Sequence, residues 1–334
     1  MLHKILLSLL ISIILCPLPQ LEIETYRKFV EFTKKYKKKY NSAKEYENRY
    51  KIYKNNIQEI KKTSLKTNKN LKFGLNKFAD LSKEEFAAKY LRFDPEIYRG
   101  LATINPEDLG LDDVDAPESF DWTEKGIKTK VKHQLECGAC WSFATSAAIE
   151  SQFMKDYGIN VSLSEQQLID CDLTNNGCEG GNMKKAFIYL QSNGLMLSDE
   201  YPFKGGREEC KYNESKTIAK VKNWAFVPKD EELMKKALIK YGPLAGALNG
   251  WMLEFYTGGV FVPWFDFLCP ATVNHAVVIV GYGIDETGMK YWKVKNSWGE
   301  DWGENGYFKI KRGEGTCGID QYTLVVEVEK VENK

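Results

Sequence analysis

The stretch of sequence that decides the fold and the chemistry is QLECGACW, residues 134–141. After its second cysteine, Cys140, apolar and small residues recur with helical spacing up to Gly158, which predicts a buried helix that begins at Cys140. The amino end of a helix carries the positive end of the macrodipole, which favours thiolate over thiol. Because the thiolate is the nucleophilic form of cysteine, Cys140 is the predicted nucleophile.

The pair Cys137 and Cys140 also fits a redox motif or half of a zinc site. Redox C-x-x-C motifs follow a strand of a βαβ unit, and no alternating pattern precedes Cys137. A zinc site needs further Cys or His residues at close spacing, and only His133 lies near. The sequence therefore favours a nucleophile over a redox or metal site.

The base that activates the thiol has to be one of three histidines. His3 lies in a predicted secretory signal and leaves with it. His133 lies seven residues before Cys140, where a structural or surface role is expected. His275 begins an apolar run and is the predicted base. An imidazolium beside Cys140 lowers the pKa of the thiol further and forms the ion pair of a strong nucleophile.

The eight cysteines also point to one free thiol. Cys16 lies in or beside the predicted signal. The other seven are an odd number, so in an oxidising compartment one thiol stays free and six can pair. Spacing alone leaves fifteen pairings open. These seven are Cys137, Cys140, Cys171, Cys178, Cys210, Cys269 and Cys317.

The chain begins with Met-Leu-His-Lys and an apolar run over residues 5–15. This run is too short to span a bilayer and has the charge pattern of a secretory signal, predicted at residues 1–16. We expect entry into the endoplasmic reticulum, then an acidic, lysosome-like compartment or the extracellular space. No later segment approaches about 20 apolar residues, so no membrane anchor is expected. The net charge of +1 gives no reason to expect nucleic acid.

Residues 24–91 are rich in lysine, lack cysteine and have helical spacing. One predicted stripe recurs at three- and four-residue steps and consists of Glu45, Arg49, Tyr53, Asn56 and Ile60. An ordinary amphipathic helix has the same spacing. The run Ser82-Lys83-Glu84-Glu85 predicts a capping box that opens a short helix. Residues 92–115 contain several prolines and glycines and are expected to form a linker.

The two parts of the chain differ in charge. Residues 1–115 carry 22 Lys and Arg against 16 Asp and Glu, a net +6, and residues 116–334 carry 25 against 30, a net −5. Segments of opposite sign are expected to attract one another.

Beyond residue 116 the spacing predicts helices in residues 140–194 and a β-rich part from about residue 255. Ser164 opens one helix, Gly194 closes a second over Met183–Asn193, and a third lies between Asp230 and Gly242. The predicted strands are Ala276–Val280, Tyr291–Lys295, Tyr307–Lys311 and Tyr322–Val328. The expected fold class is α+β, with a helical half and a β-rich half.

The core Cys-Gly-Ala-Cys-Trp at residues 137–141 matches the signature of papain and the cathepsins. The chain resembles this family, and cathepsin L in particular, over nearly its whole length. The resemblance implies a papain-like two-domain fold, with a helical left domain, a β-barrel-like right domain and an N-terminal helical inhibitory prodomain. It implies that Asn296 orients His275 and that Trp298 shields their hydrogen bond from water. Gln134 and the backbone N–H of Cys140 are then the oxyanion donors.

The region before residue 116 resembles the family's propeptide. The stripe fits the pattern E-x3-R-x3-F-x2-N-x3-I-x3-N, with Tyr53 in place of Phe and Ser64 in place of the last Asn. The run from Gly74 to Asp80 fits the second propeptide motif without change. The resemblance implies a zymogen with an inhibitory propeptide at residues 17–115, a peptidase domain at residues 116–334 and activation at acidic pH. No His-rich insertion is present to block the cleft, which favours an endopeptidase.

The resemblance also assigns the other sites. It pairs Cys137 with Cys178, Cys171 with Cys210 and Cys269 with Cys317. It assigns substrate binding to Gly180, Gly181, Met183, Ala247, Ala276, Trp298 and Tyr322, with Tyr322 at the floor of the pocket for the second residue on the acyl side. It implies no cofactor, no metal and a monomer. The implied partners are protein and peptide substrates, the chain's own propeptide and cystatin-type inhibitors.

Short motifs around Cys140, Glu150 and His275 resemble most the viral cathepsins of insect baculoviruses. That resemblance implies breakdown of host tissue late in infection, and an arthropod lysosomal or digestive cathepsin is the alternative. Asn160 and Asn213 open N-x-S sequons and are expected glycosylation sites.

Leu135 is one departure from the family, whose members mostly have glycine there. A leucine at this position argues against a need for positive φ.

Overall fold

The computed structural model describes residues 20–67, 70–95, 109–263 and 268–332. The predicted signal at residues 1–16 and most of the predicted linker, residues 96–108, lie outside the described residues. The chain divides into two compact units. The first holds the described residues up to Glu59 together with Lys77–Ser82, and the second holds Ile60–Asn76 and Lys83 onward.

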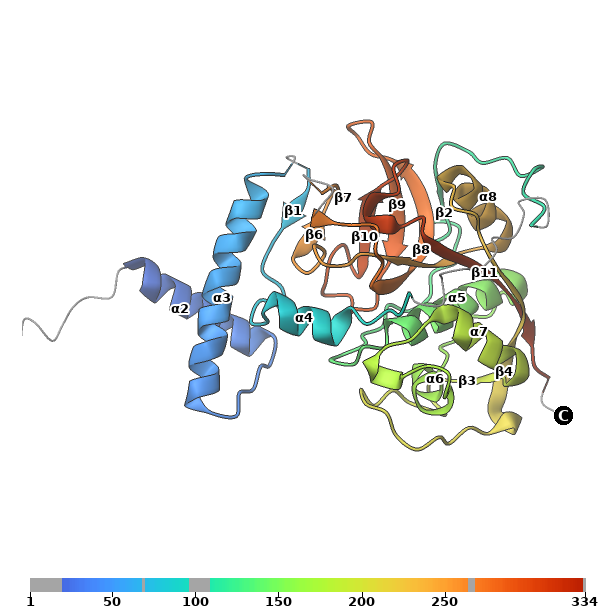
Figure 1. Cartoon of the computed structure of the whole chain (residues 1–334), viewed down its shortest axis with the longest axis horizontal. Helices are drawn as coiled ribbons and strands as arrows, with labels where there is room; N and C mark the ends of the chain where they lie inside the picture. Colours follow the sequence, from blue (N-terminus) through green and yellow to red (C-terminus); the bar gives the residue numbers. More distant parts are fainter. Residues whose placement is uncertain (1–19, 68–69, 96–108, 264–267, 333–334) are drawn as a thin grey trace, which may run out of the picture. The chain divides into compact units, whose positions relative to one another are not determined.

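The first unit is built on α2 (Gln20–Lys35) and α3 (Ala43–Ser64), whose last turn belongs to the second unit (Figure 1). The predicted stripe is the inner face of α3, where Tyr53 and Asn56 are buried. The Asn56 amide donates to the carbonyls of Ala79 and Leu81 at 2.9 and 2.8 Å. The stripe thus supplies the polar contacts that fix residues 79–81 on the helix.

The second unit contains a sheet of nine strands among its described residues, with β2 paired to β8 off the main path. Along the main path the order is β3 (Leu195–Met196), β4 (Thr217–Phe226), β11 (Tyr322–Lys330), β5 (Leu244–Leu248), β8 (His275–Ile284), β9 (Lys290–Lys295), β10 (Tyr307–Lys311) and β7 (Val260–Phe261). The strand off the path is β2 (Phe120–Asp121). A separate pair joins β1 (Lys72–Phe73) to β6 (Tyr256–Gly258).

Two helices of the second unit begin at the predicted caps Ser164 and Asp230, but the helix that starts at Met183 ends at the cap Asn193 and not at the predicted Gly194. The helices of this unit are α4 (Lys83–Tyr90), α5 (Cys140–Tyr157), α6 (Glu165–Cys171), α7 (Met183–Ser192) and α8 (Glu231–Tyr241), with short 3-10 turns at Gly177–Glu179, Glu214–Lys216 and Thr316–Gly318. Ser164 Oγ accepts from Gln167 N at 3.0 Å, and Asp230 Oδ1 accepts from Glu232 N at 2.7 Å. The predicted capping by Ser164 and Asp230 is confirmed.

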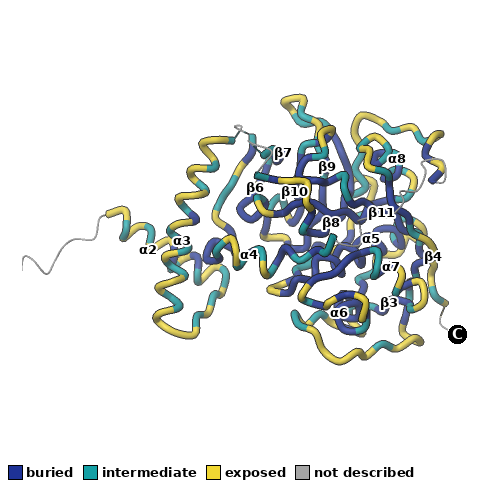
Figure 2. Tube along the Cα trace, in the orientation of Figure 1, coloured by how far each residue is buried: buried dark blue, intermediate teal, exposed yellow. Residues whose placement is uncertain are grey.

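Helix α5 lies in the centre of the second unit, against β8 and β11. Every residue from Cys140 to Phe153 is buried, and Figure 2 shows the helix as a dark blue segment. Gly158 ends it in the left-handed conformation that glycine adopts without cost. A helix buried on all sides fixes its first residue within the core.

Two expectations about the organisation of the chain were wrong. The β-rich part does not begin near residue 255, because β4 and β5 precede it. Strand β4 begins with buried residues that alternate with the half-buried Ile218 and Lys220, and it continues with the exposed Lys222 and Asn223. This surface-like composition conceals the strand. Residues 92–94 are not a loose linker, since Phe93 is buried and its backbone N–H donates to Asn274 O at 2.9 Å.

Glu254 is a carboxylic acid in the interior of the second unit, with 3% of its surface exposed. Its backbone oxygen accepts hydrogen bonds from Asn76 Nδ2 at 2.7 Å and Trp302 Nε1 at 3.2 Å. Its Oε1 has no hydrogen-bond partner among the described residues. An ionised carboxylate in such a place is costly.

Burial therefore raises the pKa of Glu254 well above its usual value. Two charged residues of α4 face it: Lys83 opposes the rise and Glu84 adds to it. The folded pKa exceeds the unfolded one, so the protonated form contributes stability that is complete below about pH 4.5 and is lost as the pH rises through the folded pKa.

We expect Glu254→Gln to raise the stability of the full chain by about 1–2 kcal/mol at pH 7 and by close to nothing at pH 4. The measurement is thermal unfolding of chains that also carry Cys140→Ser. Glu314→Gln is the matched control, because Glu314 is exposed and pairs with Lys311. An equal effect of Glu254→Gln at both pH values would contradict this account.

None of the helices in the described part of the chain combines the length and the apolar character needed to cross a bilayer.

Candidate active site

Cys140 is the first residue of α5, is fully buried and has a free thiol. The preceding residue, Ala139, provides no side-chain cap, so the first backbone N–H groups of the helix remain available to the sulfur. The predicted helix start is confirmed. A thiol in this position is the one cysteine sulfur of the described residues that is not in a disulfide.

His275 and Asn296 form a hydrogen-bonded pair at the start of β8 and just after β9. His275 Nε2 lies 2.8 Å from Asn296 Oδ1. The Asn296 oxygen also accepts from the backbone N–H of Ser297 at 2.8 Å, which fixes the orientation of the amide. Nε2 must therefore carry the proton and donate it, and Nδ1 has a free lone pair. Nδ1 has no hydrogen-bond partner among the described residues.

Trp298 covers this pair. Its ring is stacked on the His275 imidazole with 4.7 Å between centroids and 30° between planes. Both side chains are fully buried. The stacking excludes water from the His275–Asn296 bond, and a hydrogen bond in such a medium is stronger than in water.

Gln134 is held by Ser297, the residue next to Asn296. Its Oε1 accepts a hydrogen bond from Ser297 Oγ at 2.7 Å, so its amide nitrogen faces the opposite way. That nitrogen donates to Cys137 O at 3.0 Å and lies 3.5 Å from Tyr90 O. Ser297, which the sequence analysis did not single out, thus sets the direction in which Gln134 donates.

The expectation for Leu135 was wrong. Its backbone has φ of +53°, in the left-handed region that costs a residue with a Cβ about 1–2 kcal/mol. The turn closes with Cys137 N donating to Gln134 O at 3.4 Å. Two fixed neighbours hold Leu135 in this strained conformation. Gln134 is hydrogen-bonded to Ser297, and Cys137 is in a disulfide.

Residues 90–94, the covering segment, pass over the cysteine and the histidine. Arg92 O accepts from Gly181 N at 3.3 Å, and Asp94 N donates to Gly181 O at 3.0 Å. Arg92 NH2 also lies 3.1 Å from Glu179 Oε2. The segment runs beside Gly181 as a parallel bridge between Phe93 and Gly181. It occupies the cleft with main-chain hydrogen bonds of the kind a peptide would make.

This cover holds both reactive groups neutral. Burial raises the pKa of the Cys140 thiol to about 11. Hydrogen bonds from the backbone N–H groups of Ala276 and Arg92 have the opposite effect and lower this pKa, but burial outweighs them. Burial lowers the pKa of His275 to about 4, although its bond to Asn296 works the other way. At neutral pH the covered site contains a thiol and an imidazole rather than an ion pair.

Most of the predicted substrate-binding residues lie near Phe93, whereas Trp298 lies over His275. Tyr322 pairs with Ala247, which pairs with Ala276, so the three stand in one row across β11, β5 and β8. The Phe93 ring meets Tyr322 edge to face at 4.9 Å. Met183 begins α7 and is fully buried in the same cluster. At Gly180 an added Cβ would lie 2.4 Å from the Arg92 oxygen, so only glycine permits this approach.

Asn182 is a neighbour that the sequence analysis missed. Its Oδ1 accepts from the Tyr322 hydroxyl, and its Nδ2 donates to Asp94 O at 2.9 Å. Its position at the start of α7, where an asparagine caps the helix, was the signal available in the sequence.

Buried charges behind the site were also missed. Lys132 Nζ lies 2.6 Å from both Glu150 Oε1 and Glu165 Oε1, which ties the segment before Gln134 to α5 and α6. Burial lowers the pKa of Lys295, the residue before Asn296, to about 8. In the sequence these residues are charges inside apolar helices and strands, a pattern that indicates buried ion pairs only after the fold is known.

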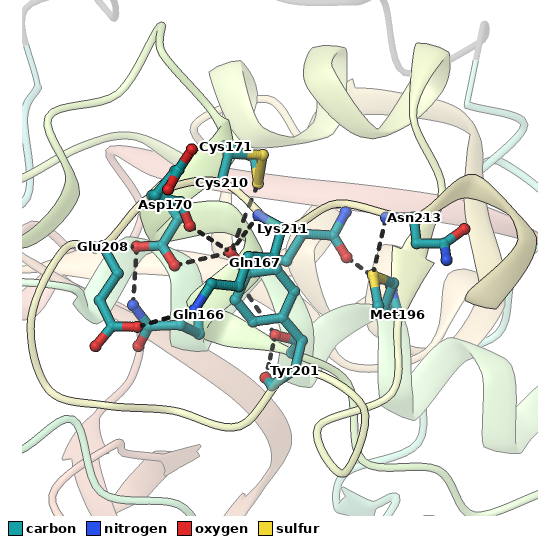
Figure 3. The surroundings of a disulfide bond; sticks show 12 residues. Gln166, Gln167, Asp170, Cys171, Met196, Tyr201, Glu208, Cys210, Lys211 and Asn213 are labelled. Carbon is teal, nitrogen blue, oxygen red and sulfur yellow. Dashed lines mark hydrogen bonds and ion pairs between the residues drawn. A yellow bond between two sulfur atoms is a disulfide. The ribbon is translucent and has the colours of Figure 1, made fainter.

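The structure contains the disulfides Cys137–Cys178, Cys171–Cys210 and Cys269–Cys317, the pairing that the family resemblance implied. Figure 3 shows the surroundings of the second. There Tyr201 OH donates to Asp170 Oδ2 at 2.9 Å and accepts from Lys211 N at 2.9 Å. The Cys171–Cys210 disulfide and the Tyr201 hydroxyl together hold the loop after Tyr201 against α6.

The remaining predicted sites lie away from the cleft or at its margin. Both sequon residues, Asn160 and Asn213, are exposed. Asn213 Oδ1 accepts from Ser215 N at 3.1 Å. His133 is half-buried and forms a backbone bridge with Trp298. The described residues contain no group of three or more His, Cys, Asp or Glu side chains that could hold a metal ion.

Comparison with known proteins identifies the family to which the chain belongs. The family model described as papain family cysteine protease matches residues 116–326, and the cathepsin propeptide inhibitor domain matches residues 29–86. Cysteine proteinase 1 of Dictyostelium discoideum is 37% identical over 90% of this chain and 92% of its own length. Viral cathepsin of Adoxophyes honmai nucleopolyhedrovirus is 36% identical over 87% of this chain and 88% of its own.

Among solved structures, digestive procathepsin L 3 of Tenebrio molitor larval midgut matches with a TM-score of 0.81 and 34% identity. The match covers 91% of this chain and 99% of that one. The α+β fold is therefore the papain-like two-domain fold. The chain belongs to the papain family of cysteine proteases and is a zymogen with a cathepsin-type propeptide.

Proposed function

We propose that the chain is a cysteine endopeptidase in which Cys140 is the nucleophile and His275 the base. The observation that carries this proposal is a free thiol at a helix start, in contact with the backbone N–H of Ala276 and thus beside His275. The Nε2 of this histidine is fixed by Asn296, and its Nδ1 is free. Once the covering segment leaves, Nδ1 can take the thiol proton. The resulting thiolate and imidazolium stabilise each other.

In the reaction the Cys140 sulfur attacks the carbonyl carbon of the scissile bond. The carbonyl oxygen becomes an oxyanion and accepts hydrogen bonds from Gln134 Nε2 and the Cys140 backbone N–H. The His275 imidazolium gives its proton to the leaving amine, the C–N bond breaks and a thioester remains. Neutral His275 then takes a proton from water, whose oxygen attacks the thioester and releases the acid and the Cys140 sulfur.

We propose residues 17–115 as the inhibitory propeptide and residues 116–334 as the mature peptidase. Main-chain bonds from Arg92 and Asp94 to Gly181 support inhibition by occupation of the cleft. Two partly exposed ion pairs, Lys89–Glu136 and Arg92–Glu179, join the propeptide to the peptidase within the second unit. Acid protonates such carboxylates, so low pH weakens this hold and promotes processing.

The preferred substrates have an apolar or aromatic residue second on the acyl side of the scissile bond. Phe93 supports this preference, because its ring packs against Tyr322 in the row with Ala247 and Ala276. Tyr322 offers no negative charge for an arginine.

The route is secretory, and the working compartment is acidic or extracellular. The similarity to a viral cathepsin supports breakdown of host tissue proteins late in infection as the setting, and digestion or lysosomal turnover in an arthropod is the alternative. A gene found within a viral genome and transcribed late in infection supports the first, and a host chromosomal gene contradicts it.

The first test uses purified variants and a peptide library. Cys140→Ser and His275→Ala should fold but neither process themselves nor cleave peptides, with losses of at least about 10³-fold in kcat/KM. His133→Ala is the matched control and should retain most activity. Efficient self-processing by Cys140→Ser, or a library that prefers Arg to Phe or Leu at the second acyl-side position, would overturn the assignment.

The covered thiol should react slowly. With a pKa of about 11, roughly one Cys140 thiol in ten thousand is ionised at pH 7 in the intact chain. We expect iodoacetamide to alkylate the intact chain at least about 100-fold more slowly than the processed enzyme. Cys140→Ser controls for other sites of labelling. Equal rates before and after processing would contradict masking by the covering segment.

Processing should also respond to salt. Arg92 and Glu179 have 38% and 80% of their side chains exposed, so ions screen their attraction. At a fixed, mildly acidic pH, raised ionic strength should speed processing a few-fold. A rate that is flat from low to molar salt would contradict a role of these ion pairs in processing.

A further inference from the structure

The covering segment touches the peptidase on both sides of Cys140. Each contact shows where a substrate side chain can lie once the segment has left. Arg92 lies against Gly138 and Gly180, on the side of Glu179. Leu91, one residue earlier, lies on the other side, against Gly250 and His275. The order of contacts follows the chain, so the segment lines the cleft from one side of the nucleophile to the other.

The chemistry tells which side receives the leaving group. In the proposed function, on which this inference rests, the imidazole of His275 protonates the leaving amine. The residue that carries this amine must lie on the imidazole side of Cys140. Leu91 is on that side, since a Cβ added at Gly250 would lie 2.7 Å from Leu91 Cδ2 and 3.1 Å from His275 Cβ.

The contact is close and apolar. Leu91 is 7% exposed, although it belongs to a segment that has to leave. Its methyl group occupies the space that any side chain at residue 250 would take. Trp251, next along the chain and 40% exposed, adds apolar surface close by.

The turn that forms this contact is rigid. Gly250 N donates to Asn274 Oδ1 at 2.9 Å, and Trp251 N donates to Asn249 Oδ1 at 3.2 Å. Asn249 in turn donates to Thr272 O at 2.8 Å and to Cys317 O at 2.8 Å. A subsite held in this way is present before substrate binds, so the enzyme does not have to order it.

We propose that Gly250 determines specificity for the residue that follows the scissile bond, and that this subsite accepts a leucine-sized apolar side chain. The absence of a side chain at Gly250 creates the space beside His275. Burial of a leucine there removes apolar surface from water, whereas a glycine at the same substrate position gains nothing. Acidic or amide side chains lose their hydration at this surface and are disfavoured.

The test uses the processed enzyme and quenched peptides that differ only in the residue after the scissile bond. The wild type should cleave the leucine peptide with kcat/KM about 10-fold above the glycine peptide. Gly250→Ala should lower this ratio at least about 5-fold, because its methyl group fills the space. Any disturbance of His275 by that methyl group slows both peptides and cancels in the ratio.

Gly206→Ala is the matched control, since a Cβ there meets nothing within 4 Å. It should leave the ratio as in the wild type. A wild-type ratio near one, or a ratio that Gly250→Ala does not change, overturns the inference while peptide cleavage still stands. Failure to cleave any peptide overturns the proposed function instead.

A second arm uses the intact chain. Leu91→Gly removes the apolar contact with Gly250 and should increase the rate of Cys140 alkylation by iodoacetamide at neutral pH about 3-fold or more. Leu65→Gly is the control, since Leu65 is 88% exposed. Equal rates for the two variants would contradict a role of Leu91 in the subsite.

Discussion

A cysteine that cleaves peptide bonds has to be kept away from the bonds of its own chain until it reaches its place of work. Here the main chain of residues 90–94 does this by lying over Cys140 and His275. Two hydrogen bonds to Gly181 and one to Asn274 hold the segment in place. Its cover excludes water, raises the pKa of the thiol and lowers that of the imidazole. In the proposed function, inhibition is therefore both steric and electrostatic.

The geometry beneath the cover is already assembled. Ser297 contributes twice, by fixing the Asn296 amide through its backbone N–H and the Gln134 amide through its hydroxyl. The helix α5 places the sulfur, and the start of β8, a strand in the interior of the sheet, places the imidazole. In the proposed function, activation then requires no rearrangement of the catalytic residues, only departure of the covering segment. This is preorganisation in the sense that the donors are in place before charge develops.

The sequence predicted local structure better than contacts between residues far apart along the chain. The helix start at Cys140, the helix caps at Ser164 and Asp230, and all four predicted strands follow local spacing rules, because caps and periodicity are properties of neighbours along the chain. The left-handed φ of Leu135 and the burial of Phe93 were not predictable from local spacing. Both depend on partners far along the chain, namely the bond of Ser297 to Gln134 and the row of Tyr322. The burial of Lys132 was not predictable from local spacing either, because its carboxylate partners come from α5 and α6.

The central claim is that Cys140 is the reactive thiol and that processing exposes it. The most direct measurement is mass spectrometry of the acid-treated chain after reaction with an epoxide-type thiol reagent, followed by peptide mapping. The account predicts one label, on Cys140, in a product that has lost the covering segment, and no label on the untreated chain. A label on another cysteine, or a processed product that takes up no label, would contradict it.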